Sequence, residues 1–150
     1  AISGDTVMVG ATGDDDKGSE SGSAYVFTRD VAGSLTSGWT QRAKLLAADS
    51  AATDYFGMSV AISGDTVVVG AYQDADKGAS SGSAYVYTRD VAGSLTSGWT
   101  QRAKLLAADS AAGDRFGTSV AISGDTVVVG AYQDGDKGRY SGSAYVFTCD

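Results

Sequence analysis

The sequence contains no histidine, no proline and no asparagine, and it has a single cysteine. Without histidine the chain lacks the commonest general base and the imidazole metal ligand, which excludes Ser-His-Asp catalysis and the usual zinc sites. Without asparagine it has no acceptor for N-linked sugar. No apolar run is long enough to span a membrane. We therefore expect a protein that is not an enzyme and that does not insert into a membrane.

What the sequence does contain is a repeat with a period of sixty residues. The stretch Phe56–Ala71 returns as Phe116–Ala131, and Arg29–Ala52 returns unchanged as Arg89–Ala112. Periods of this length are typical of propellers, solenoids and arrays, in which each unit buries its apolar face against a neighbour. We interpret residues 1–150 as one array of about two and a half repeats, divided into residues 1–60, 61–120 and 121–150.

The complete middle repeat predicts four short strands. Apolar and small residues alternate from Phe56 to Ile62, as in a half-buried strand, and a continuous valine run follows at Val67 to Val69. Tight-turn residues and two polar loops separate the segments. The last segment carries Arg102 and Lys104, which are suited to an exposed edge strand. The predicted strands are 56–62, 66–72, 82–89 and 99–106.

Four antiparallel strands with small residues on the first and charges on the last describe a wedge, and wedges repeated radially form a β-propeller. A linear β-solenoid is the alternative, although its coils are usually shorter and its strands parallel. The fold class expected is all-β, with propeller blades of four antiparallel strands. Two and a half repeats leave open edges, so we expect either part of a longer propeller or a segment that assembles with other copies.

A family resemblance rests on these same residues. The motif Phe56-Gly57-x-Ser59-Val60-Ala61, followed by Val68-Val69-Gly70-Ala71, resembles the FG-GAP repeat of integrin α-subunit heads and of many bacterial and algal surface proteins. The resemblance covers the whole chain. It implies a propeller, commonly of seven blades, at an extracellular or cell-surface location and with a role in recognition or adhesion.

The chain departs from that family in one way that bears on metal binding. Integrin-type repeats carry their calcium ligands in an Asp-rich loop between the first two strands, but here that connection is only Ser63 to Thr66. A lone carboxylate on a tight turn cannot supply the six or more oxygens that calcium prefers. We do not transfer the family's calcium site to this connection.

Acidic residues are instead expected to gather at the opposite end of the blades. In an up-and-down blade, the loops after the second and the fourth strand lie at one end. Five basic residues are placed there, Lys17, Lys77, Arg115, Lys137 and Arg139. Twelve acids are placed with them: Asp14, Asp15, Asp16, Glu20, Asp49, Asp54, Asp74, Asp76, Asp109, Asp114, Asp134 and Asp136. Twelve against five gives −7, equal to the net charge of the chain, so this end should repel nucleic acid and attract cations or basic partners.

These loops have three possible roles. Asp74-x-Asp76-x-Gly78 resembles the opening of a calcium loop, although no bidentate glutamate follows at the twelfth position. Asp and Gly are also ordinary turn residues, and the loops could contact a protein or glycan partner directly. The candidate calcium ligands are Asp14, Asp16, Asp54, Asp74, Asp76, Asp114, Asp134 and Asp136.

Two further features have more than one interpretation. Trp39 and Trp99 suit either packing against a neighbouring blade or stacking on sugars. Cys149, which stands where the other repeats carry Arg29 and Arg89, represents either drift at a repeat edge or a disulfide to another molecule.

The function expected is a non-catalytic extracellular binding or adhesion module. The alternative is a structural fibre or surface-layer protein, formed by head-to-tail self-assembly of the repeats.

Overall fold

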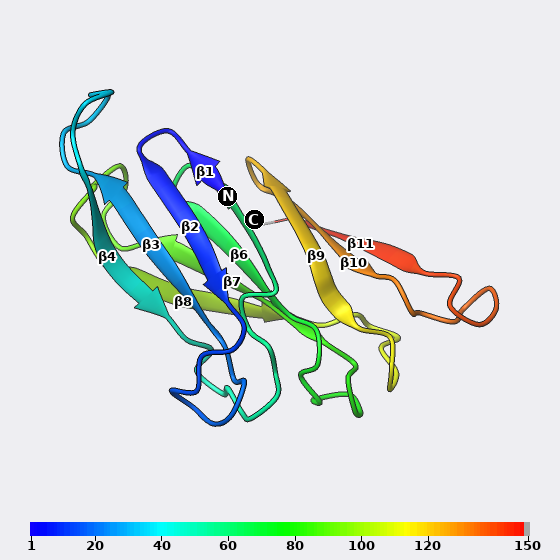
Figure 1. Ribbon diagram of the computed structural model, residues 1–150. Coiled ribbons are helices and arrows are strands. Elements are labelled where there is room, and N and C mark those ends of the chain that lie inside the picture. The colour runs from blue at the N-terminus through cyan, green and yellow to red at the C-terminus, as the bar shows by residue number, and fades with distance from the viewer. Residues whose placement is uncertain (149–150) are drawn as a thin grey trace.

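The computed structural model describes residues 1–148, in which every regular element is a β-strand. The strands form three antiparallel sheets, one for each repeat (Figure 1). The all-β prediction is confirmed, and the sheets are consistent with partial propeller blades. No helix suited to crossing a membrane occurs in residues 1–148. Cys149 and its predicted alternatives lie outside the described residues.

The first two sheets have four strands each, in sequence order. The first contains β1 (Ile2–Ser3), β2 (Thr6–Ala11), β3 (Ser23–Arg29) and β4 (Trp39–Leu45). The second contains β5 (Ser59–Ser63), β6 (Thr66–Ala71), β7 (Ser83–Arg89) and β8 (Trp99–Leu105). In the third, β10 (Thr126–Ala131) lies between β9 (Phe116–Ser123) and β11 (Ser143–Thr148).

The three sheets fan out from their first strands (Figure 1). β1 contacts β5, and β5 contacts β9, whereas β4 and β8 lie at the outer edges of their sheets. This is the wedge arrangement that the small residues of the first strand predict. The third sheet has β11 as its outer strand among the described residues.

The predicted strand boundaries hold to within a residue or two, except at the start of the first strand. In the second sheet β5 begins at Ser59, after Phe56 and Gly57, whereas β9 of the third sheet begins at Phe116, as the motif predicts. The Phe56 amide donates to the Ser21 carbonyl over 3.0 Å, and Gly57 has a φ of 95°, in the region that favours glycine. The motif therefore connects two repeats as well as starting one.

Glycine is required where successive sheets meet. A Cβ built on Gly10 of β2 would lie 1.9 Å from the Gly57 carbonyl oxygen, and one on Gly70 of β6 would lie 1.9 Å from the Gly117 oxygen. Real side chains never approach a backbone oxygen so closely. The Phe-Gly and Gly-Ala elements of successive repeats thus meet at the boundary between two sheets, which explains why each has a glycine there.

The core follows the same repeat logic. Val67, Val68 and Val69 are all fully buried, as their continuous apolar run predicts. Phe56 packs edge-on against Tyr85 and Tyr87 of its own sheet, with ring centroids 5.4 Å and 6.2 Å apart. Apolar residues of sheets one and two form one buried cluster, and those of sheets two and three form another. Each sheet buries one face against the next, so the sheets depend on their neighbours.

Candidate functional site at the acidic loop end

Five loops meet at one end of the blades, and we call this region the acidic loop end. Backbone hydrogen bonds join the two loops of one repeat, with Thr53 donating to Ser19 over 2.8 Å and Gly113 donating to Ala79 over 2.9 Å. They also join loops of successive repeats, since Gln73 donates to Asp54 over 3.4 Å and Gln133 donates to Asp114 over 3.3 Å. The loops are therefore held against one another and not merely neighbours. The acidic loop end comprises residues 12–22, 46–58, 72–82, 106–115 and 132–142.

Each loop after a second strand is organised by one aspartate, which is buried in the second and third repeats and half-buried in the first. The Asp74 carboxylate accepts a hydrogen bond from the Asp76 amide over 3.0 Å, and the Asp74 carbonyl accepts one from the Gly82 amide over 2.9 Å. Tyr85 donates its hydroxyl proton to the same carboxylate over 2.7 Å. The Asp-x-Asp sequence thus forms an Asx turn whose first aspartate is a structural staple. Asp14 and Asp134 accept the equivalent amide bonds in their own repeats.

Three carboxylates converge in the second repeat, from Asp49, Asp74 and Asp76. The Lys104 ammonium lies among them, 2.6 Å from Asp49, 2.8 Å from Asp74 and 2.6 Å from Asp76. Burial alone would lower the pKa of Lys104, but the hydrogen bonds to the three carboxylates outweigh it and raise that pKa above its usual range. This cluster holds a cation that the protein itself supplies.

The first repeat shows the same arrangement with two carboxylates. Lys44 lies 2.7 Å from the Asp14 carboxylate and also pairs with Asp16. The hydrogen bond from Lys44 holds the pKa of Asp14 well below its usual range. Lys44 and Lys104 occupy equivalent positions on β4 and β8, so an outer-strand lysine neutralises the loop in both complete sheets.

The third repeat has the acids without the lysine. Asp109, Asp134 and Asp136 bring carboxylate oxygens within 4.8 Å of one another, and we call them the third-repeat cluster. Tyr145 donates to Asp134 over 2.6 Å and also contacts Asp109 at 2.9 Å. Within residues 1–148 no ion pair reaches this cluster. The neighbouring charges of Asp134 and Asp109 raise the pKa of Asp136.

The predicted ligands are only partly brought together. The loop pairs Asp74–Asp76 and Asp134–Asp136 do lie in clusters, and the preceding repeat does donate an acid to each. The donated acid is Asp49 or Asp109, which the ligand prediction omitted. Asp54 and Asp114 lie outside the clusters and accept hydrogen bonds from the backbone amides of Ala51 and Ala111, at 2.6 Å each.

Two expectations about the outer strand need correction. Lys104 does not blunt an exposed edge, because its side chain is only 16% exposed and points into the acids. Lys44 and Lys104 also belong to the acidic loop end, where the sequence had not placed them. Twelve acids against seven bases leave −5 there and not −7, while the other end carries five acids against four bases within residues 1–148. The excess of acid at the loop end remains, but it is smaller than expected.

Of the two tryptophans, Trp99 packs, as the first of its two interpretations predicts. Trp99 lies against the cluster between sheets one and two, with the Arg89 guanidinium 4.6 Å from its ring centroid. Trp39 has the equivalent cation–π contact with Arg29 at 4.5 Å. An arginine therefore lies over each indole. Trp39 is 39% exposed and belongs to no buried cluster among the described residues, so its role stays a prediction.

The groups of three acids could hold a metal ion, but they do not fit calcium equally well. Calcium takes six to eight oxygens, and at the second-repeat cluster it would have to displace the ammonium of Lys104. Lys44 blocks the Asp14–Asp16 pair in the same way. Only the third-repeat cluster presents three carboxylates without a competing cation among the described residues.

Comparison with known protein families identifies the family of this chain. The FG-GAP repeat matches residues 1–27, 39–87 and 99–147. The chain belongs to the FG-GAP repeat family. The first match covers β1 to β3, and the second and third each run from an outer strand, β4 or β8, through the next three strands. The contacts between Phe-Gly and Gly-Ala described above therefore lie between successive family units. No individual curated protein matches the chain significantly.

Proposed function

We propose that this FG-GAP repeat chain is a non-catalytic extracellular binding and adhesion module. Its contact surface is the acidic loop end, and its partner is a protein or glycan that presents positive charge or hydrogen-bond donors. The observation that carries the proposal is that loops of successive repeats are joined by backbone hydrogen bonds into one surface with an excess of acid. A surface fixed in this way binds without first ordering its loops, which lowers the entropic cost of association.

The setting and the excluded partners follow from the same features. FG-GAP repeats are typical of extracellular or surface proteins, and this supports the location. A net charge of −7 disfavours binding to nucleic acid and to anionic membranes.

The proposal includes calcium binding at the third-repeat cluster alone. Asp109, Asp134 and Asp136 supply three carboxylates, fewer than the oxygens of a complete site. The affinity should therefore be that of a weak extracellular module, on the order of 0.1 to 1 mM. The two lysine-filled sites, at Lys44 and Lys104, should show no response to calcium in this range.

The loop-end surface can be tested with a matched pair of double variants. Asp15→Asn with Glu20→Gln removes two exposed charges from the acidic loop end, and each amide keeps an acceptor oxygen for its local hydrogen bond. Asp90→Asn with Asp125→Asn removes two charges from the other end. The probe is a labelled deca-lysine peptide at low salt, together with immobilised neutral and acidic polysaccharides.

The loop-end double variant should bind deca-lysine about fivefold more weakly than the parent, since each lost surface pair is worth about 0.5 kcal/mol. The control variant should bind deca-lysine as tightly as the parent does. The immobilised acidic polysaccharide should retain neither the parent nor a variant. Equal weakening in both variants would mean that only the net charge matters, and the loop end would lose its assignment as the contact surface.

A structural fibre or surface-layer protein is the second candidate, and one observation favours it. Leu35 of the first repeat is 92% exposed, whereas the identical Leu95 is half-buried and its carbonyl accepts a hydrogen bond from Thr28 of the neighbouring sheet. An exposed residue of this kind suits docking onto another copy. The two functions differ in particle size: a fibre protein gives filaments by electron microscopy, whereas a binding module gives discrete particles by light scattering.

A further inference from the structure

A groove of about 390 Å³ opens between the second and third sheets. Its walls are mainly apolar and come from both sheets. The residues that matter here are Thr66, Val86, Thr88, Arg102, Leu105 and Phe147.

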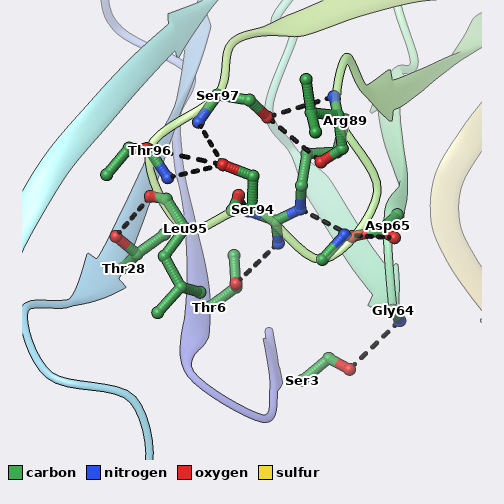
Figure 2. Close-up of polar contacts among 12 residues, drawn as sticks. Ser3, Thr6, Thr28, Gly64, Asp65, Arg89, Ser94, Leu95, Thr96 and Ser97 are labelled. Atoms are coloured by element: carbon green, nitrogen blue, oxygen red, sulfur yellow. Dashed lines mark hydrogen bonds and ion pairs between the residues drawn. The ribbon is translucent and has the colours of Figure 1, made fainter.

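The equivalent surface between the first and second sheets is covered by the chain itself. The covering segment is residues 90–105, which includes the loop before β8 and then β8. Figure 2 shows part of this loop, Ser94 to Ser97, next to Thr6 and Thr28 of the first sheet. The Thr28 hydroxyl donates to the Leu95 carbonyl over 2.9 Å, and Arg89 donates to the Thr6 hydroxyl over 2.9 Å. Trp99 packs against the apolar cluster beneath. This interface shows what kind of segment such a surface accepts.

Side-chain exposure shows that the surface between the first and second sheets is covered and that the groove between the second and third sheets is open. Thr6 and Thr28 are buried, whereas the same residues one repeat later, Thr66 and Thr88, are half-buried. The Arg42 side chain is 25% exposed and that of its counterpart Arg102 is 53% exposed. The sequence of the two surfaces is nearly the same, so the exposed copy has the properties of an acceptor.

The outer edge of the third sheet is open along the same groove. β3 pairs with β4, and β7 pairs with β8, but within residues 1–148 β11 pairs only with β10. Val146 of β11 is 67% exposed, while the equivalent Val26 of β3 is fully buried. An edge of unpaired backbone groups accepts an added strand.

Besides the groove and the open edge, the charge of the third-repeat cluster also favours an added strand. In the second sheet, Lys104 lies opposite Tyr85 in the strand register and reaches three acids. Tyr145 holds the same place in β11, and its hydroxyl contacts two acids of the third-repeat cluster. A strand added to β11 in the register of β8 would therefore bring a lysine to a cluster that lacks one.

We propose that the groove, the free edge of β11 and the third-repeat cluster together form an acceptor site for an extended segment with the chemistry of residues 90–105. That segment carries a leucine, a tryptophan and a lysine in fixed order, and a separate polypeptide can supply it. The site goes beyond the loop-end function, because it uses the blade face and not the acidic loops alone. The binding mode is addition of a strand, with main-chain bonds for affinity and the lysine and tryptophan for selectivity.

The experiment uses the full chain and a labelled synthetic peptide with the sequence of residues 89–107, in EDTA so that divalent ions do not compete. Fluorescence anisotropy gives the affinity, and hydrogen exchange locates the peptide. We expect binding on the order of 1 to 100 µM, together with slowed exchange in β11. A scrambled peptide should not bind. Replacing the peptide's lysine by methionine, or its tryptophan by alanine, should weaken binding about tenfold each.

A double-variant cycle tests the charge pairing. Asp109→Asn with Asp136→Asn in the chain should weaken binding of the parent peptide about tenfold. Binding of the methionine peptide should not change, because that peptide has no lysine to pair with these two carboxylates. Asp15→Asn with Glu20→Gln removes two charges outside the groove and the third-repeat cluster; it is the matched control and should have no effect.

Two results would overturn the proposal. The first is that the scrambled peptide binds as well as the parent, or that protection appears away from β11. The second is that the chain self-associates through this face and the peptide fails to disperse it, which would make a whole second copy the occupant. The loop-end proposal is independent of both, because its variants, Asp15→Asn and Glu20→Gln, lie outside the groove.

Discussion

The same aspartate has a different electrostatic role in successive repeats, and the difference is a single lysine. Asp76 pairs with Lys104 at 2.6 Å, whereas Asp136, one period later, faces two other carboxylates. The neighbouring charges of Asp134 and Asp109 raise the pKa of Asp136. A carboxyl group whose pKa is raised by folding is stabilising only when protonated, so its ionised form costs stability at neutral pH.

We therefore predict opposite effects from one substitution. Asp76→Asn should destabilise the protein by about 0.5 kcal/mol, because it removes a partly exposed ion pair. Asp136→Asn should raise the melting temperature at pH 7, because it removes a repelled charge. The gain should fade as the pH falls through the pKa of Asp136 and should be absent near about pH 3, where the parent carboxyl is protonated as well.

Thermal unfolding at both pH values measures the pair. A loss of stability in both variants at pH 7 would show that the Asx turns need a carboxylate at this position whatever its neighbours. In that case repulsion would not be the main influence on Asp136.

The sequence predicted the local half of these clusters. Asp74 with Asp76 and Asp134 with Asp136 are neighbours along the chain, so their proximity follows from the spacing alone. Asp49, Asp109 and the lysines come together only through packing of one repeat on the next, and no local pattern reports that. Their shared position one period apart, with a lysine at the end of each outer strand, was the available signal.

At the scale of the element, the loop before each outer strand is a folded unit built on one arginine. Arg89 donates to Asp65 over 2.6 Å and to the Ser94 carbonyl over 2.6 Å, and it stacks on Trp99. Figure 2 shows this arginine reaching across to Thr6 of the first sheet as well. Arg29 makes the same contacts within its own repeat but has no partner corresponding to Thr6 in residues 1–148.

The two arginines provide a matched comparison. Arg89→Lys should cost about 2 kcal/mol of unfolding free energy, because lysine cannot keep three planar contacts in a site where the arginine side chain is 4% exposed. Arg29→Lys should cost roughly 1 kcal/mol, since that side chain is more exposed and makes no contact between sheets. Urea unfolding of both variants gives the difference. If the two losses are equal, the bond to Thr6 contributes nothing to the stability of the interface.

The strands themselves were the part of the fold most open to prediction. Alternation and the valine run located the second, third and fourth strands within a residue, because these signals depend on which face each side chain buries. The start of the first strand was misplaced at Phe56 in the second sheet, where β5 begins at Ser59, but not in the third, where β9 begins at Phe116. The bond from the Phe56 amide to the Ser21 carbonyl joins residues 35 apart, and a contact at that separation leaves no trace in a short window of sequence.

For the whole molecule, the sheets behave as a row in which each touches only the next. Buried clusters lie between sheets one and two and between sheets two and three. Such arrays lose stability unit by unit and not everywhere at once. The glycines at the two boundaries, Gly10 and Gly70, have the same close contact to a carbonyl oxygen and so allow each boundary to be disturbed separately.

Gly10→Ala and Gly70→Ala should each destabilise the protein by about 1 to 3 kcal/mol, because the new methyl group overlaps a backbone oxygen that cannot move freely. Hydrogen exchange should show which sheets are destabilised by each substitution. Gly10→Ala should speed exchange in β1 to β4 and spare β9 to β11, whereas Gly70→Ala should do the reverse. Gly13→Ala is the control, since a methyl group there meets no atom within 4 Å and the backbone is not left-handed. Equally fast exchange in all three sheets from either variant would mean that the repeats unfold as one cooperative body, and the nearest-neighbour description of this chain would be wrong.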